Sequence, residues 1–142
     1  MFTSDDRTVS LFKTALAHLC AAVLCAFFGA VYERFSHEVY SYWVIYAFAL
    51  PLSLGALPLL SLALYGRKLP GRVSLWLWNA GIAALTVGCV FRGVLEIYGT
   101  TNRLWAAYPI VGGALLTLGL VSYLLFGWQR RTEAKITVMP AA

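Results

Sequence analysis

The amino-acid sequence predicts an all-α membrane protein, with four transmembrane helices arranged as two tandem, parallel-repeat helical hairpins. Composition is the first reason: of 142 residues, 61% are hydrophobic and only 12% are charged, and the mean hydropathy is +0.75. A soluble domain carries about 25% charged residues, so this chain is expected to lie in a lipid bilayer. The second reason is an internal repeat, which divides the chain into two similar halves. Residues 1–142 are therefore predicted to form a single polytopic membrane domain.

Four apolar stretches predict the helices. Each has the roughly 20 residues that a helix needs to cross a bilayer, and they cover about residues 11–32, 43–65, 75–96 and 105–126. The connectors between them are short, which leaves no room for a soluble domain. Tyrosine and tryptophan residues gather at the ends of these stretches, as is typical at the level of the lipid headgroups.

The placement of lysine and arginine predicts the orientation. Of the 11 such residues, only Arg34, Arg92 and Arg103 fall on the side of the first and third connectors, and the rest lie beside the chain termini or in the connector 66–74. Cytoplasmic loops carry the excess of positive charge, so the N- and C-termini are expected in the cytoplasm and the chain in the cell inner membrane, as a multi-pass protein. This asymmetry also accounts for the net charge of +5, and no nucleic-acid partner is expected.

Two short motifs carry the internal repeat. The C-x-F-x-G pattern of residues 25–29 recurs at 89–93, and the run that begins at Pro51 recurs in the same register from Pro109. They predict a first repeat at about residues 11–66 and a second at about 75–127, related by an axis along the membrane normal. A polar tail, residues 129–142, lies outside both. Chance similarity between two apolar hairpins is the alternative.

Glycines and prolines at repeated positions predict how the helices pack. Gly29 and Gly93 each follow a cysteine by four residues, and small residues at this spacing let helix backbones approach closely in lipid. Pro51 and Pro109 each remove a backbone hydrogen bond. Kinks at these two positions are expected to open a shallow vestibule at the outer end of the helices.

Charged and polar side chains near the outer boundary form the candidate ligand-binding site. By their spacing, Glu33 and Glu96 lie on the same helix faces as the repeated glycines, and Arg92 lies four residues before Glu96. A cation within a span normally faces other helices and has a partner. The predicted site comprises Glu33, Arg34, His37, Arg92, Glu96 and Asn102. Whether these residues form a ligand site or only a structural layer of ion pairs stays open.

No motif of a known catalytic chemistry is present in the sequence, and we expect no enzyme activity. The three cysteines lie within the apolar stretches and do not form a C-x-x-C pair. His18 and His37 are too far apart along a helix to ligate one haem, and no histidine–cysteine cluster has metal-ligand spacing. No cofactor or metal is expected. His18 is predicted to be a packed or interfacial residue, and Asn79 is predicted to join helices by a hydrogen bond.

Two classes of function fit these patterns. In the first, the outer pocket binds or translocates a small polar or ionic ligand, as part of a transporter, channel or sensor. In the second, the protein is a non-catalytic subunit or assembly factor of a larger membrane complex, and its charged outer face docks a partner. With only four spans, a transporter is expected to form a homo-oligomer or to join other membrane subunits.

Overall fold

The protein is mostly helical, with no strand, in the part that its computed structural model describes, namely residues 4–36, 39–65 and 70–138, with side chains described for 8–36, 39–65 and 70–125. The all-α prediction is therefore confirmed. In chain order the elements are α1 (Ser4–Phe35), α2 (Tyr42–Ile45), the π-helix η1 (Pro51–Ala56), α3 (Leu57–Tyr65), α4 (Arg72–Ile97), the 3-10 helix η2 (Arg103–Ala106) and α5 (Ala107–Val138).

Three helices are long and apolar enough to cross a membrane, which indicates a membrane protein. They cover Thr8–Phe35, Arg72–Ile97 and Arg103–Leu125. Large apolar side chains lie exposed along all three, among them Leu24 and Leu125. Such surfaces are costly in water but suit a hydrocarbon environment.

The second predicted span is not one continuous helix. A turn at residues 46–48 separates α2 from the following helical segment, and Pro51–Tyr65 is a shorter apolar helix. At 1.5 Å per residue this segment is about 22 Å long, less than the roughly 30 Å of a bilayer core. The expectation of four uninterrupted spans is therefore met for three of them only.

Proline chemistry accounts for the irregular helix that follows this turn. Pro58 has no N–H group, so the carbonyl of Leu54, four residues earlier, lacks its usual helical donor. The backbone widens here, and the Leu57 N–H donates to the carbonyl of Leu52, five residues back. The indole Nε1 of Trp78 on α4 donates to the Leu54 carbonyl across 2.8 Å. The π-helix is thus held to α4 by a backbone group that proline set free.

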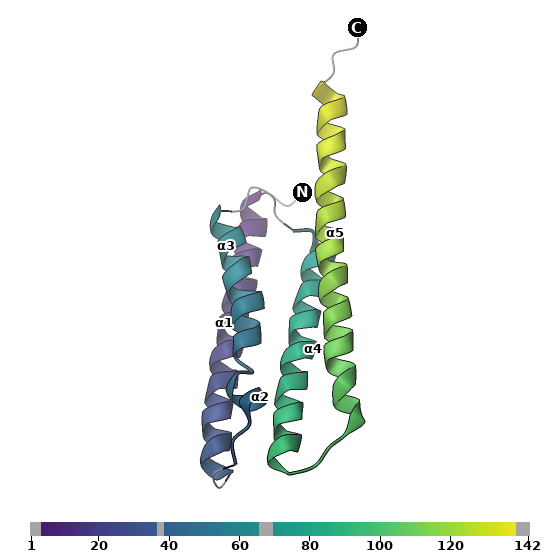
Figure 1. The fold of residues 1–142 in the computed structure, drawn as a ribbon. Helices are drawn as coiled ribbons and strands as arrows, with labels where there is room; N and C mark the ends of the chain where they lie inside the picture. Colours follow the sequence, from purple (N-terminus) through teal and green to yellow (C-terminus); the bar gives the residue numbers. More distant parts are fainter. Residues whose placement is uncertain (1–3, 37–38, 66–69, 139–142) are drawn as a thin grey trace.

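Two hairpins form the fold, and they meet through the broken segment (Figure 1). In the first, α1 packs against α2, η1 and α3; in the second, α4 packs along α5. The close backbone contacts between the hairpins come from α2 and η1 against α4, and, among the described residues, α1 meets α4 through side chains only. Within the same part of the chain, α5 meets α4 and η2 but no element of the first hairpin. The helix bundle is therefore not closed, because α5 packs against the second hairpin only.

The end of α1, α2, the end of α4 and the start of α5 lie together at one end of the molecule (Figure 1). We term this the outer end, following the predicted topology. The helix α5 begins there, runs the length of α4 and continues beyond the other helices through Val138. Residues 129–138, predicted as part of a polar tail, therefore extend α5.

The two hairpins pack in different ways, so the repeat stays a prediction from the sequence. In the first, a Cβ added to Gly55 would meet the imidazole of His18. Its counterpart in the second, Gly113, has nothing within 4 Å of such a Cβ, and Gly112 lies against Leu85 instead. Pro51 and Pro109 share one feature: each is within the first turn of a helical segment, where a missing N–H costs little.

Candidate functional site

A wedge formed by α2 occupies the space between the ends of α1 and α4, where a vestibule was expected. Val44, with no exposed surface, is its centre. A Cβ added to Gly29 would lie 3.2 Å from the Val44 carbonyl oxygen, and one added to Gly93 would overlap Val44 Cγ2. Gly29 in the first hairpin and Gly93 in the second therefore both leave space for Val44.

The charged residues of α4 are engaged by groups beside this wedge. Ser41, only 1% exposed, donates its hydroxyl hydrogen bond to Glu96 Oε2 across 2.6 Å. Arg92 places its guanidinium carbon 4.7 Å from the centre of the Trp105 ring, a cation–π contact. Trp105 in turn lies 6.2 Å from Trp43, between ring centres. Within the described region these contacts take the place of the Arg92–Glu96 ion pair that the spacing suggested.

Two charged side chains at the outer end keep an unpartnered buried atom. Glu33 Oε1 and Arg92 Nε are both buried, and neither has a hydrogen-bond partner in the described part of the chain. A buried polar atom without a partner costs about 1–3 kcal/mol, and more when the group is charged. The described residues therefore leave this cost at Glu33 and Arg92 without a compensating hydrogen bond.

The other predicted site residues lie at the rim of the outer end. Arg34, in the last turn of α1, is exposed. Asn102 is also exposed, and its Oδ1 accepts a hydrogen bond of 3.0 Å from the Leu104 N–H, so it caps η2. His37 lies outside the described residues. The structure thus gives Asn102 a structural role and leaves Arg34 exposed at the end of α1.

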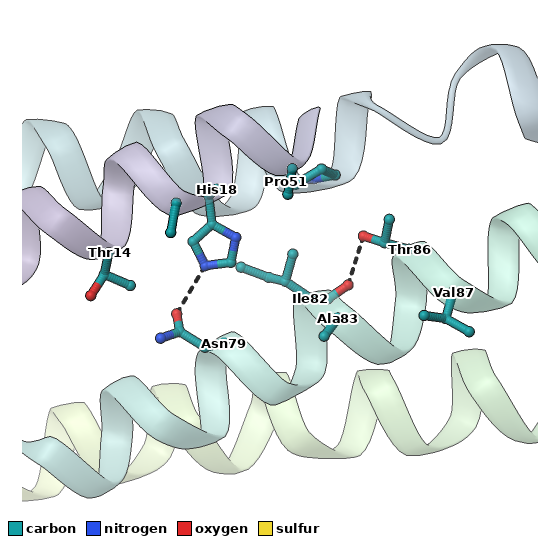
Figure 2. Close-up of a pocket in the computed structure, with 10 residues that line it drawn as sticks. Thr14, His18, Pro51, Asn79, Ile82, Ala83, Thr86 and Val87 are labelled. Atoms are coloured by element: carbon teal, nitrogen blue, oxygen red, sulfur yellow. Dashed lines mark hydrogen bonds between the residues drawn. The ribbon is translucent and has the colours of Figure 1, made fainter. Parts of the chain in front are cut away.

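A cleft of about 460 Å³ lies further along the molecule, between α1 and α4, and Figure 2 shows it from the side. Thr14, Ala17, His18 and Ala21 line it from α1, Pro51 from η1, and Asn79, Ile82, Ala83, Thr86 and Val87 from α4. Exposed residues from both walls, Ala17, Ala83 and Val87, stand at its mouth. The cleft therefore opens on the surface that three apolar helices give to lipid.

One side-chain hydrogen bond crosses this cleft. The imidazole Nε2 of His18 lies 3.0 Å from Asn79 Oδ1, a pair separated by 61 residues in the sequence. With the Asn79 amide in this orientation its oxygen can only accept, so Nε2 is assigned as the nitrogen that carries the proton. The other ring nitrogen, Nδ1, faces Gly55, and a Cβ there would lie 2.7 Å from it. Only glycine at position 55 leaves room for this ring.

The polar character of the cleft comes from His18 and Asn79. The threonine hydroxyls bond to their own helices: Thr14 Oγ1 donates to the Ser10 carbonyl across 2.9 Å, and Thr86 Oγ1 to the Ile82 carbonyl across 2.8 Å. The Asn79 Nδ2 group has no hydrogen-bond partner among the described residues. Two N–H donors are thus left over beside an apolar cleft.

The sequence predicts a packed or interfacial His18 and a hydrogen bond from Asn79 to another helix, but it does not identify the two residues as partners. Each is a polar side chain within an apolar helix, which in lipid is a sign of a functional site or of a partner. The missing information was the rotation of α1 relative to α4, which no local pattern supplies.

Comparisons with known proteins add no assignment. No protein-family model matches the chain, and no curated protein or solved structure matches it either. The functional argument therefore depends on the geometry of the outer end and of the cleft.

Proposed function

We propose that the protein is a non-catalytic subunit or assembly factor of a larger membrane complex, and that it docks a partner protein through its outer end. The observation that carries the proposal is the pair of buried, unpartnered atoms, Glu33 Oε1 and Arg92 Nε. One is an acceptor and the other a donor, and a partner that offers a donor and an acceptor would satisfy both once docking moves the side chains that cover them. The outer end is thus a surface that a protein partner completes.

The surroundings of these two atoms support a protein partner. The wedge residues Ser41 and Val44 are buried, so the wedge fills the space that a small ligand would need in a vestibule. Around it lie exposed tyrosine and arginine side chains, two residue types that are enriched at protein interfaces: Tyr40, Tyr42, Tyr98, Arg34 and Arg103. An outward pocket for a small polar ligand has less support.

Site-specific photo-cross-linking in native membranes tests this proposal. A photoreactive amino acid replaces Tyr98, which is 72% exposed at the outer end, or Trp76, which is 75% exposed near the start of α4. We expect a protein adduct of one discrete mass from position 98 and none from position 76. Mass spectrometry then tells a different protein from a second copy of this chain.

Arg92→Gln tests the part that Arg92 plays in docking, because it removes the guanidinium, whose Nε is buried, and adds no bulk. In this variant the adduct from position 98 is expected to weaken at least several-fold while the protein level stays the same. Adducts with lipid alone at position 98, or equal protein adducts at 98 and 76, would refute docking through the outer end.

A further inference from the structure

We propose that the cleft between α1 and α4 binds a membrane-soluble carbonyl compound of the quinone class, with Asn79 as the group that recognises its oxygen. This binding site is independent of the docking surface, since it lies beside η1, which lines it through Pro51, and shares no residue with the outer end.

The chemistry of the His18–Asn79 pair sets what the cleft can recognise. His18 Nδ1 lies beside Gly55 and has no hydrogen-bond partner among the described residues, so the tautomer with hydrogen on Nε2 is favoured. That hydrogen is donated to Asn79 Oδ1. The bond fixes the orientation of the amide and leaves its two Nδ2 hydrogens without a partner in the described part of the chain. A ligand for this group must present an acceptor, and a carbonyl oxygen is one.

The depth of the pair excludes ordinary phospholipids as the intended ligand. His18 lies five residues beyond Lys13 on α1, and Asn79 seven residues beyond Arg72 on α4, which are distances of about 7 and 10 Å along each helix. The pair is therefore below the level of these cations, inside the apolar segments. Phospholipid ester groups stay near the headgroups, whereas a quinone carries its carbonyl into the hydrocarbon.

The shape of the cleft fits the rest of such a molecule. Its volume of about 460 Å³ is within the range of roughly 300–1,000 Å³ that is usual for small-molecule sites. From the polar pair it continues past Ile82 and Ala83 to Val87 (Figure 2), with small or apolar side chains on both walls. The mouth beside Ala17 and Ala83 lets a ligand enter sideways from the bilayer.

Binding of a short-chain benzoquinone to the full-length protein in nanodiscs of saturated phospholipid tests the proposal. We expect saturable binding of one quinone per chain. Asn79→Leu, which keeps the volume but removes both donors, is expected to raise the Kd about tenfold, because one hydrogen bond in lipid contributes about 1–2 kcal/mol. An alkylbenzene of the same size lacks the carbonyl oxygens. Its Kd for the unmodified protein is expected to be as high as the Kd of the quinone for Asn79→Leu.

If Asn79→Leu unfolds the protein, a second pair of variants still tests the proposal. Ala83→Leu fills the cleft and should abolish binding, whereas Ala114→Leu makes the same change at an exposed position of α5 and should leave the Kd unchanged. Circular dichroism verifies folding of each variant. Non-saturable uptake, equal affinity for the alkylbenzene, or an unchanged Kd in folded Asn79→Leu would each overturn the proposal and leave the His18–Asn79 pair as a helix-to-helix link only.

Discussion

Trp78 and Leu54 are joined by a hydrogen bond from an indole nitrogen to a backbone carbonyl, at 2.8 Å. The bond links α4 to the π-helix of the first hairpin. It exists because Pro58 cannot donate to that carbonyl, and a free carbonyl in lipid is costly. A proline that weakens its own helix therefore creates the attachment point for the other hairpin.

Trp78→Phe is expected to lower the free energy of unfolding by about 1–2 kcal/mol, because the Leu54 carbonyl loses its side-chain donor. The measurement is thermal or denaturant unfolding of the purified protein in mild detergent. Trp76→Phe, at an exposed position of the same helix, is the control and should change little. In a Pro58→Ala background the helix regains its own N–H, so the effect of Trp78→Phe should shrink; an undiminished effect would show that the bond is not the cause.

Gly93→Ala is expected to destabilise the protein by about 1–3 kcal/mol, since the added methyl group overlaps Val44 at the wedge. Gly113→Ala places the same methyl group where nothing lies within 4 Å and should be neutral or slightly stabilising. Unfolding in detergent measures both. Gly99 is a poor control, because its φ of +67° disfavours any side chain. Equal stability of the two alanine variants would remove the evidence that the wedge depends on Gly93.

Arg92→Lys keeps the charge but loses the flat guanidinium that stacks on Trp105. We expect a loss of about 0.5–2 kcal/mol in unfolding free energy, together with a shift in tryptophan emission. Arg103→Lys makes the same substitution at an exposed position and should change neither quantity. If both variants behave alike, the stacking geometry has no energetic weight.

Cysteine labelling tests the predicted orientation. In a background with the native cysteines replaced by alanine, a membrane-impermeant maleimide added to intact cells should label Thr101→Cys, an exposed residue of the outer end. It should not label Gly71→Cys, just before α4, until the membrane is permeabilised. The opposite pattern would place the charged end in the cytoplasm and reverse the side from which a docking partner comes.

The fold class could be predicted from the sequence because the length and composition of an apolar stretch alone decide whether a helix can cross a bilayer. The interruption at 46–48 lies in equally apolar sequence, so hydropathy does not reveal it. For the irregular helix η1 that follows, Pro58 was the available signal, because it implies a free carbonyl at Leu54. Its effect on η1 depends on Trp78, which belongs to the other hairpin.

In the candidate sites, too, local features could be predicted from the sequence and contacts between distant segments could not. The positions of Glu33 and Arg92 near the ends of their helices follow from local spacing. That Glu96 bonds to Ser41, and Arg92 to the face of Trp105, depends on the course of the connectors. The pairing of His18 with Asn79 depends on the rotation of two helices that do not touch along their backbones.

The Trp78–Leu54 bond and the seat of Val44 on Gly93 also bear on the order in which the chain is completed during synthesis. Residues 42–65 leave the ribosome before α4 does. At that stage the Leu54 carbonyl lacks its bond to Trp78, and Val44 lacks its contact with Gly93. The first hairpin reaches its final shape only when residues 78–93 arrive. A nascent chain stalled before α4 would therefore present an exposed polar backbone group to the lipid, which makes it a natural client for insertion chaperones and for membrane proteases.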